Sequence, residues 1–266
     1  MAEITEIEAL LRIGVTRLVP LHGGDLSEVV RVDLEDGTRR VAKTGPMAGR
    51  EARMLQAMAA AGAPVPRVVA ASQALLVMEY LPEAPASPAG WASLGTALAG
   101  LHGATGASYG WDEDYAFGPA PLPNARTDDW PAFWAERRLL AWPEHLPTDL
   151  ARRLEALAAR LPDRLPRCPP PALLHGDLWS GNVLFMAAGA AMIDPACYHG
   201  HAEVDLAMLH LFGRPGAGFA ESYGPLEPGW QDRRALYQLW PALVHLRLFG
   251  GGYRAMVAGC LDRLRA

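Results

Sequence analysis

Hydrophobic and polar residues alternate in short runs along the first eighty residues, which is the pattern of half-buried β-strands. The runs predict five strands, over Leu18–Pro20, Val29–Leu34, Arg39–Thr44, Arg67–Ala71 and Leu75–Tyr80. Asp36 and Gly37 separate the second and third runs, and an Asp-Gly pair favours a tight hairpin. We therefore expect a five-stranded antiparallel sheet in this part of the chain.

A helical pattern lies between the third and fourth strands, from Ala48 to Ala61, where apolar residues recur every three or four positions. Glu51 lies four and seven residues before Leu55 and Met58, so it shares their stripe. The pattern predicts that the Glu51 carboxylate points inward. A glutamate in a first helical turn is also typical of a plain charge favoured by the helix dipole.

The pattern changes after residue 80. Proline and small residues fill Leu81–Gly90, which favours a linker. Beyond it, helices are predicted over Trp91–His102, Trp130–Trp142 and Asp149–Leu161, and further helices up to residue 266. One hairpin is predicted among them, from Val183–Met186 to Ala191–Ile193, with its turn at Ala188 and Gly189.

These elements predict an α+β chain in two lobes. Residues 1–80 form a small lobe with the sheet and one helix, residues 81–90 a linker, and residues 91–266 a larger, mainly helical lobe.

Composition and charge exclude several function classes. Half of the residues are hydrophobic and 20% are charged, with a formal net charge of −5 and no dense basic run, so we expect no nucleic-acid partner. The first fifteen residues do not form a secretion signal, and the longest apolar stretch, 183–193, is too short to span a bilayer. Three widely spaced cysteines form neither a disulfide framework nor a metal motif. We expect a cytoplasmic monomer with no membrane association.

The chain has 23 arginines but a single lysine, Lys43. A lysine ammonium is a compact point charge, whereas a guanidinium is a planar fork, so one retained lysine indicates a site where arginine does not serve. A general drift toward arginine that left one lysine behind explains the count equally well. Strand alternation places Lys43 on the same face as Val41, which predicts an inward-pointing ammonium.

The segment from His175 to Asn182 carries the clearest chemistry. It fits the catalytic-loop pattern H-x-D-L-x-x-x-N of kinases, and Asp194, after the predicted hairpin, takes the place of the aspartate of D-F-G. Phosphoryl transfer needs a carboxylate that accepts the hydroxyl proton, and Asp177 is the candidate. Asn182 and Asp194 supply the oxygen ligands that Mg²⁺ prefers.

The small lobe would then bind ATP. We expect Lys43 to contact the phosphates and Glu51 to hold it by an ion pair. Gly23 and Gly24 would close over the phosphates, although such a pair is more often a plain turn. Main-chain groups of three residues at the end of the last strand would bind the adenine: Met78, Glu79 and Tyr80.

Other residues have both a functional and a structural interpretation. We expect His175 to position the catalytic loop through hydrogen bonds. Asp205 either braces this loop or, with Glu203, caps a helix. Trp179 is a packing residue or a platform for substrate. His199 and His201 resemble a metal pair, but no further ligand cluster accompanies them.

The segment Leu173–Asn182 resembles the signature of the fructosamine-3-kinase (ketosamine-3-kinase) family, which belongs to the aminoglycoside phosphotransferase and choline kinase-like group of the protein-kinase-like fold. The similarity extends over most of the chain. It includes Asp194–Met208, Asp128–Leu139 and Leu236–Leu239, with His245, Phe249, Gly250 and Tyr253 beyond.

The resemblance implies a two-lobed kinase that phosphorylates the 3-hydroxyl of a ketosamine, the product of glycation of an amine, and uses ATP. It places the proton acceptor at Asp177 and the adenine-binding segment at residues 78–80. It also makes His245, in the last helices, a candidate substrate residue.

Two other functions remain open at this stage. One is a kinase of the same fold for another small hydroxyl compound such as choline or an aminoglycoside, for which the acidic run Asp112–Asp114 gives some support. The other is a catalytically silent nucleotide-binding module. The intact set of Lys43, Asp177, Asn182 and Asp194 argues against that module.

Overall fold

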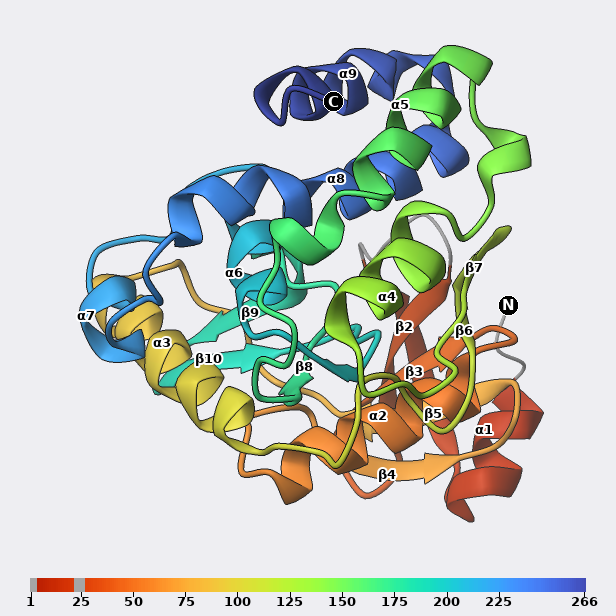
Figure 1. The fold of residues 1–266 in the computed structure, drawn as a ribbon. Coiled ribbons are helices and arrows are strands. Elements are labelled where there is room, and N and C mark those ends of the chain that lie inside the picture. The colour runs from red at the N-terminus through yellow and green to blue at the C-terminus, as the bar shows by residue number, and fades with distance from the viewer. Residues whose placement is uncertain (1–3, 22–26) are drawn as a thin grey trace.

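A computed structural model describes residues 4–21 and 27–266. The predicted phosphate loop, Gly23 and Gly24, lies outside the described residues. The chain folds into a small lobe with a sheet and a larger, mainly helical lobe (Figure 1).

The small lobe contains the predicted five-stranded sheet. Its strands are β1 (Val15–Pro20), β2 (Glu28–Leu34), β3 (Arg39–Thr44), β4 (Val68–Ala71) and β5 (Leu75–Glu79). They run in the order β1-β2-β3-β5-β4, and every neighbouring pair is antiparallel. The prediction of an antiparallel sheet is confirmed, and β1 begins three residues earlier than expected.

One helix covers each face of the sheet. On one face, Ile7 of α1 (Ile4–Leu11) packs against Val30 and Val32. On the other face, α2 (Ala48–Ala60) packs Leu55 against the strands, together with Val41. Because side chains alternate along a strand, Lys43 follows Val41 toward α2. The predicted direction of Lys43 is confirmed, whereas α1 was missed.

The larger lobe is built from seven α-helices among the described residues. They are α3 (Pro88–Gly103), α4 (Trp130–Trp134), α5 (Thr148–Ala158), α6 (Glu203–Leu209), α7 (Phe219–Tyr223), α8 (Trp230–Phe249) and α9 (Arg254–Arg263). Short 3-10 turns lie at Pro143–His145, Leu161–Asp163, Ser180–Asn182 and Gly251–Tyr253.

Three of these helices differ from their predicted bounds, and α5 begins at Thr148 rather than Asp149 and ends at Ala158 rather than Leu161. Helix α3 begins at Pro88 rather than Trp91, because the Ser87 hydroxyl accepts from the Gly90 amide and proline suits a first helical turn. Helix α4 changes into a π-helical turn at Ala135–Leu139 and ends before the predicted Trp142. The division at residues 81–90 stays a prediction.

The hairpin that follows the catalytic loop is displaced by one residue. Strand β9 (Val183–Met186) pairs with β10 (Gly189–Met192), and Met186 lies opposite Gly189, so the turn is Ala187 and Ala188. The prediction of a turn at Ala188 and Gly189 is wrong. A Cβ on Gly189 would lie 2.6 Å from the Ser93 hydroxyl, so this glycine serves the close approach of α3 and not the turn.

The expectation of one hairpin in the larger lobe is also wrong. A second hairpin joins β6 (Tyr115–Phe117) to β7 (Ala120–Leu122), and β8 (Ala172–Leu174) pairs with β11 (Tyr198–Gly200). Strands of three residues give too short an alternation to recognise, and Pro119 and Pro121 disfavour a strand prediction.

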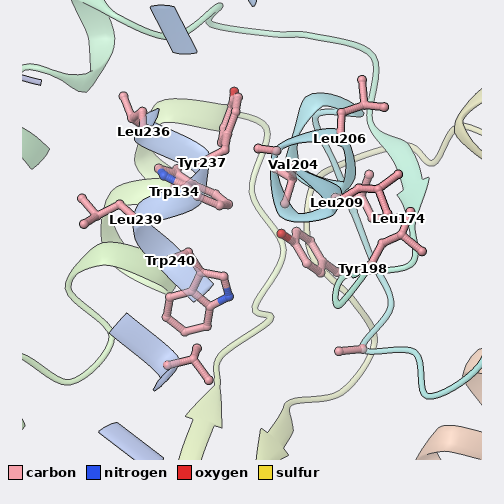
Figure 2. Packing of buried hydrophobic residues seen from close by; sticks show 14 of the residues in the cluster. Trp134, Leu174, Tyr198, Val204, Leu206, Leu209, Leu236, Tyr237, Leu239 and Trp240 are labelled. Carbon is pink, nitrogen blue, oxygen red and sulfur yellow. The ribbon is translucent and has the colours of Figure 1, made fainter. Parts of the chain in front are cut away.

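The core of the larger lobe forms around α8. Figure 2 shows Leu236, Tyr237, Leu239 and Trp240 of α8 beside Trp134 of α4, and Leu206 and Leu209 of α6 near Leu174. Arg138 is buried in this core without a carboxylate partner. Its guanidinium lies 4.1 Å from the centre of the Tyr198 ring and donates to the Pro123 carbonyl and to Asn124 Oδ1. These contacts connect the π-helical turn to β11.

Among the described residues, no helix combines the length and apolar character needed to cross a membrane. All three cysteines are unpaired: Cys168 is exposed, whereas Cys197 and Cys260 are buried.

Candidate active site

A cavity of about 640 Å³ lies between the two lobes. Seven of the predicted site residues line it: Lys43, Glu51, Asp177, Trp179, Asn182, Asp194 and His245. They come from β3, α2, the catalytic loop, the segment after β10, and α8. Segments separated by up to two hundred residues therefore meet at one site.

Lys43 is the centre of the charge network in this cavity. Its ammonium lies 2.9 Å from Glu51 Oε1, 2.8 Å from Glu51 Oε2 and 2.9 Å from Asp194 Oδ1. Only 7% of Lys43 and 2% of Glu51 are exposed. The ammonium thus links a helix of the small lobe to the larger lobe, and the inward direction predicted for Glu51 is confirmed.

Burial and charge act in opposite directions on this ion pair. Burial disfavours the charged lysine, yet Glu51 and Asp194 outweigh it and raise the pKa of Lys43. Burial raises the pKa of Glu51 to about 7, against the opposing effect of Lys43. The lysine therefore stays protonated near neutral pH, as contact with phosphates requires.

Asp177 and Asn182 face each other across the catalytic loop. The Asn182 amide nitrogen donates to the Asp177 main-chain carbonyl (2.8 Å) and to Asp177 Oδ2 (3.0 Å). Burial raises the pKa of Asp177 to about 7, although the bond from Asn182 lowers it. A carboxylate with a pKa near 7 is a stronger base than an ordinary aspartate, and proton abstraction needs such a base.

The loop is fixed through its backbone. His175 Nε2 donates to the Ile193 carbonyl (2.8 Å), and His175 Nδ1 accepts from the Asp177 amide (3.2 Å). The His175 and Gly176 amides both donate to the Asp205 carboxylate, at 2.7 and 2.9 Å. His175 and Asp205 thus both contact the backbone of the catalytic loop. The helix-cap interpretation of Asp205 is wrong, because its carboxylate binds this loop.

Gly176 explains why the loop can bend at this point. Its φ is +82°, in the left-handed region, and a Cβ there would lie 2.0 Å from the Ala196 carbonyl oxygen. A side chain at residue 176 would therefore separate the catalytic loop from the segment that carries Asp194.

The donor atoms that face the cavity fit Mg²⁺. Because the Asn182 nitrogen is used by Asp177, its amide oxygen is the atom left for a cation. Asp194 adds a carboxylate, and its φ of +56° turns the chain at this position. Among the described residues, the lining holds the carboxyl groups of Glu51, Asp177 and Asp194 but only one ammonium, that of Lys43, so a bound cation would balance the charge.

The predicted adenine segment lies apart from these groups. Met78, Glu79 and Tyr80 are not among the residues that line the cavity. The Glu79 amide donates to the Arg67 carbonyl at 2.9 Å, and the Tyr80 ring lies 5.9 Å from the Arg31 guanidinium. An adenine at the end of β5 therefore stays a prediction.

Sequence reasoning missed a wall of aromatic rings along the cavity. The ring centre of Phe212 lies 6.1 Å from that of Trp179 and 5.0 Å from that of His245. The His245 ring centre lies 5.5 Å from that of Phe249 and 5.0 Å from that of Tyr253. Trp179, Phe212 and Phe249 are among the most exposed large apolar side chains. Only tertiary structure brings α8 and the residues after it to the catalytic loop.

The acidic residues at 112–114 form ion pairs and hydrogen bonds within the protein. Glu113 forms ion pairs with Arg50 and Arg53 of α2, at 3.0 and 2.7 Å. Asp112 pairs with Arg126, and Asp114 accepts from the Asn124 amide. Glu113 therefore connects α2 to the larger lobe, while Asp112 and Asp114 stay exposed at the surface.

The two histidines after Cys197 do not form a metal pair. The His199 ring stacks on Trp111, whereas His201 Nδ1 lies 2.7 Å from the Tyr237 hydroxyl in the core. Oxygens of Glu203 and Glu227 also lie near His201. Arg233 already binds Glu203 with two nitrogens, so its guanidinium supplies the positive charge that a metal ion would bring to this cluster.

Comparison with known proteins decides the family. The profile of the fructosamine kinase family matches residues 9–266. A probable ketoamine kinase of Synechocystis is 42% identical over 225 residues, which cover 77% of this chain and 74% of the relative. One of Thermus thermophilus is 40% identical over 246 residues, which cover 88% and 89%. The chain belongs to the fructosamine kinase family.

Solved structures agree with this assignment. A crystal structure assigned to a fructosamine-3-kinase from Thermobifida fusca has a TM-score of 0.91 and 34% identity, and covers 100% of this chain and 99% of that one. An amicoumacin kinase, at 17% identity and a TM-score of 0.67, shares the protein-kinase-like fold. This member of the fructosamine kinase family is thus a phosphotransferase that acts on a hydroxyl of a sugar amine. Membership of a kinase family implies that ATP is the phosphoryl donor.

We expect Lys43→Arg to lower turnover about 10²-fold, because the larger, planar guanidinium does not fit the buried position where the compact ammonium lies 2.9 Å from Glu51 Oε1 and 2.9 Å from Asp194 Oδ1. Steady-state kinetics with saturating ATP would measure the change. Arg53→Lys on the exposed face of α2 is the matched control and should stay near wild-type activity. Full activity of Lys43→Arg would show that the single lysine is accidental.

We also expect acid to destabilise the protein through His201. Burial lowers the pKa of His201 to about 3, whereas an unfolded histidine titrates near ~6.5. The unfolded state therefore binds a proton first, and stability is lost as pH falls from about 6.5 toward 3, by up to about 5 kcal/mol. Urea unfolding of wild type and His201→Asn between pH 4 and 8 measures this. Equal slopes against pH would contradict the expectation.

Proposed function

We propose that this protein transfers the γ-phosphoryl group of Mg²⁺-bound ATP to a sugar hydroxyl of a small-molecule ketosamine. The observation that carries the proposal is the convergence of Lys43, Asp177, Asn182 and Asp194 on one cavity in a member of the fructosamine kinase family. These four side chains supply a phosphate contact, a base and two metal ligands.

Lys43 would act on the phosphate side of the reaction. Its ammonium is held by Glu51 and Asp194, so the protein itself fixes this positive charge in position for phosphates. Asn182 and Asp194 would hold Mg²⁺, which when bound neutralises phosphate charge. Glu51 would keep the ammonium in place when Asp194 turns to the metal.

Asp177 would act on the acceptor side. Its carboxylate takes the proton of the sugar hydroxyl as the oxygen attacks the γ-phosphorus and the bond to the β-phosphate breaks. Asn182 donates to Asp177 Oδ2, so one carboxylate oxygen is oriented and the other is left for the hydroxyl. His175 and Asp205 would hold the loop in this geometry.

The aromatic wall, formed by Trp179, Phe212, His245, Phe249 and Tyr253, would bind the amine end of the substrate. A ketosamine carries a secondary amine, which is cationic near neutral pH, and aromatic faces attract cations. His245 Nδ1 donates to the Pro241 carbonyl, which leaves Nε2 of a neutral ring as an acceptor. Trp179 and His245 therefore become proposed substrate residues.

The remaining predictions concern location and partners. The small-molecule substrate follows from the family, whereas a cytoplasmic location, a monomeric state and the absence of a nucleic-acid partner stay predictions. No observation favours choline or an aminoglycoside over a ketosamine.

An ATP-consumption assay with a substrate panel tests the proposal. Ketosamines and ribulosamines of free amino acids, aminoglycosides and choline should be offered side by side, with and without Mg²⁺. We expect ketosamine-dependent, Mg²⁺-dependent ADP release and a phosphorylated sugar in the product. Phosphorylation of choline or an aminoglycoside alone would refute the proposal.

We expect Asp177→Asn to lower turnover by about 10²–10⁴-fold while ATP still binds, because the amide cannot accept the hydroxyl proton. Single-turnover kinetics and nucleotide titration separate the two effects. Turnover close to wild type would exclude Asp177 as the base.

We expect Trp179→Ala to raise the KM for ketosamine about tenfold with little change in the KM for ATP, because it removes one face of the aromatic wall. Trp111→Ala is a control outside the cavity, where the ring stacks on His199. An equal rise in both KM values would place Trp179 at the nucleotide instead.

A further inference from the structure

The buried carboxylate of Asp205 orients the peptide groups immediately before the catalytic aspartate. Asp205 is fully buried, and its two oxygens accept from the amides of His175 and Gly176. A third donor, His102 Nε2, lies 3.2 Å from Asp205 Oδ2. A buried carboxylate is costly unless its lone pairs are filled, so the position of Asp205 depends on all three donors.

His102 lies near the end of α3 and is itself fixed by a second partner. Its Nδ1 lies 2.9 Å from the hydroxyl of Tyr223, the last residue of α7. The two rings also meet edge to face, with centres 5.7 Å apart. His102 is 8% exposed. A continuous chain of hydrogen bonds therefore runs from Tyr223 through His102 and Asp205 to the catalytic loop.

The direction of these bonds follows from the groups involved. A carboxylate can only accept, so His102 Nε2 carries a proton. In a neutral imidazole Nδ1 is then the acceptor, and the Tyr223 hydroxyl must donate. Burial raises the pKa of Tyr223, and the charge of Asp205 acts in the same direction, so this hydroxyl keeps its proton. Tyr223 thus selects the ring form that can donate to Asp205.

Gly95 of α3 permits the close packing of α3 against α7 that the hydrogen bonds of His102 and Tyr223 require. Helices α3 and α7 lie side by side (Figure 1). A Cβ on Gly95 of α3 would lie 2.5 Å from the Phe219 carbonyl oxygen and 3.0 Å from the Tyr223 amide nitrogen. Any side chain at residue 95 would push α7 away from α3 and carry the Tyr223 hydroxyl with it.

We propose that His102 and Tyr223 are positioning residues of the kinase reaction: they act through Asp205 to hold the peptide groups that precede Asp177. This inference rests on the proposed role of Asp177 as the base. It makes α7, a short helix with no residue in the cavity, part of what sets the turnover rate. The chemistry requires this support because a general base must stay within hydrogen-bond reach of the hydroxyl it deprotonates.

Tyr223→Phe removes one hydroxyl and keeps the ring packing. We expect kcat to fall about three- to tenfold, as for loss of one oriented hydrogen bond, with the KM for ATP unchanged within about twofold. His102→Gln retains a donor at the position of Nε2 and should keep most of the activity, whereas His102→Leu should lose about 10²-fold. Assays should be run well below the melting temperature, with the folded fraction measured by circular dichroism.

Two further comparisons separate positioning from mere stability. In the His102→Leu background, adding Tyr223→Phe should lower kcat no further, because Tyr223 acts only through the histidine. Gly95→Ala should lower kcat about as much as Tyr223→Phe. Gly100→Ala, on the same helix with nothing within 4 Å of a Cβ, is the matched control and should leave kcat unchanged.

The outcomes distinguish this inference from the proposed function. If Asp177→Asn is inactive but Tyr223→Phe and His102→Leu have wild-type kcat and only lower melting temperatures, the two residues are structural and this inference is wrong. Additive losses in the double variant would also overturn it. If Asp177→Asn retains turnover, Asp177 is not the base, and the proposed function is wrong whatever the His102 and Tyr223 variants show.

Discussion

The site depends on one buried ammonium held by carboxylates from both lobes. Lys43 on β3 is nearly inaccessible to water, and it is stable there only because Glu51 and Asp194 compensate its charge. Removing either partner would leave a buried charge without its counter-ion. The same ion pairs fix α2 on the sheet and place the small lobe against the segment after β10, so the arrangement that forms the cavity also prepares it for phosphates.

The opposite side of the cavity is organised by a buried negative charge. Asp205 accepts from two successive amides, and Gly176 allows the bend that presents them together. A catalytic carboxylate can therefore be partly accessible to substrate and still be held in place, because its backbone is fixed from behind by a residue that never enters the cavity.

The distribution of polar and apolar groups in the cavity separates two tasks. Charged groups cluster where Lys43, Asp177 and Asp194 meet, which suits a charged phosphate and its metal. Aromatic rings from the catalytic loop, from the segment between α6 and α7, and from α8 onward line another part of it, which suits a sugar with an attached amine. The family supplies the substrate class, and this division explains how one cavity could accommodate both reactants.

The five antiparallel strands, the inward faces of Lys43 and Glu51, and the chemical groups of the catalytic loop could all be predicted from the sequence. Each depends on local periodicity or on a fixed spacing of chemical groups, such as the four residues between Asp177 and Asn182. The prediction was weakest where elements are short, as in β6 and β7, or where a glycine serves a contact rather than a turn, as Gly189 does.

Tertiary structure alone decided which distant side chains became partners. No sequence pattern connects His102 with Asp205, about a hundred residues later, or Arg53 with Glu113, sixty residues later. Contacts over such separations depend on how the helices pack and not on local spacing. The aromatic wall has the same origin: the sequence offered Trp179 and His245 as separate candidates, and only the docking of α8 beside the catalytic loop makes these rings one surface.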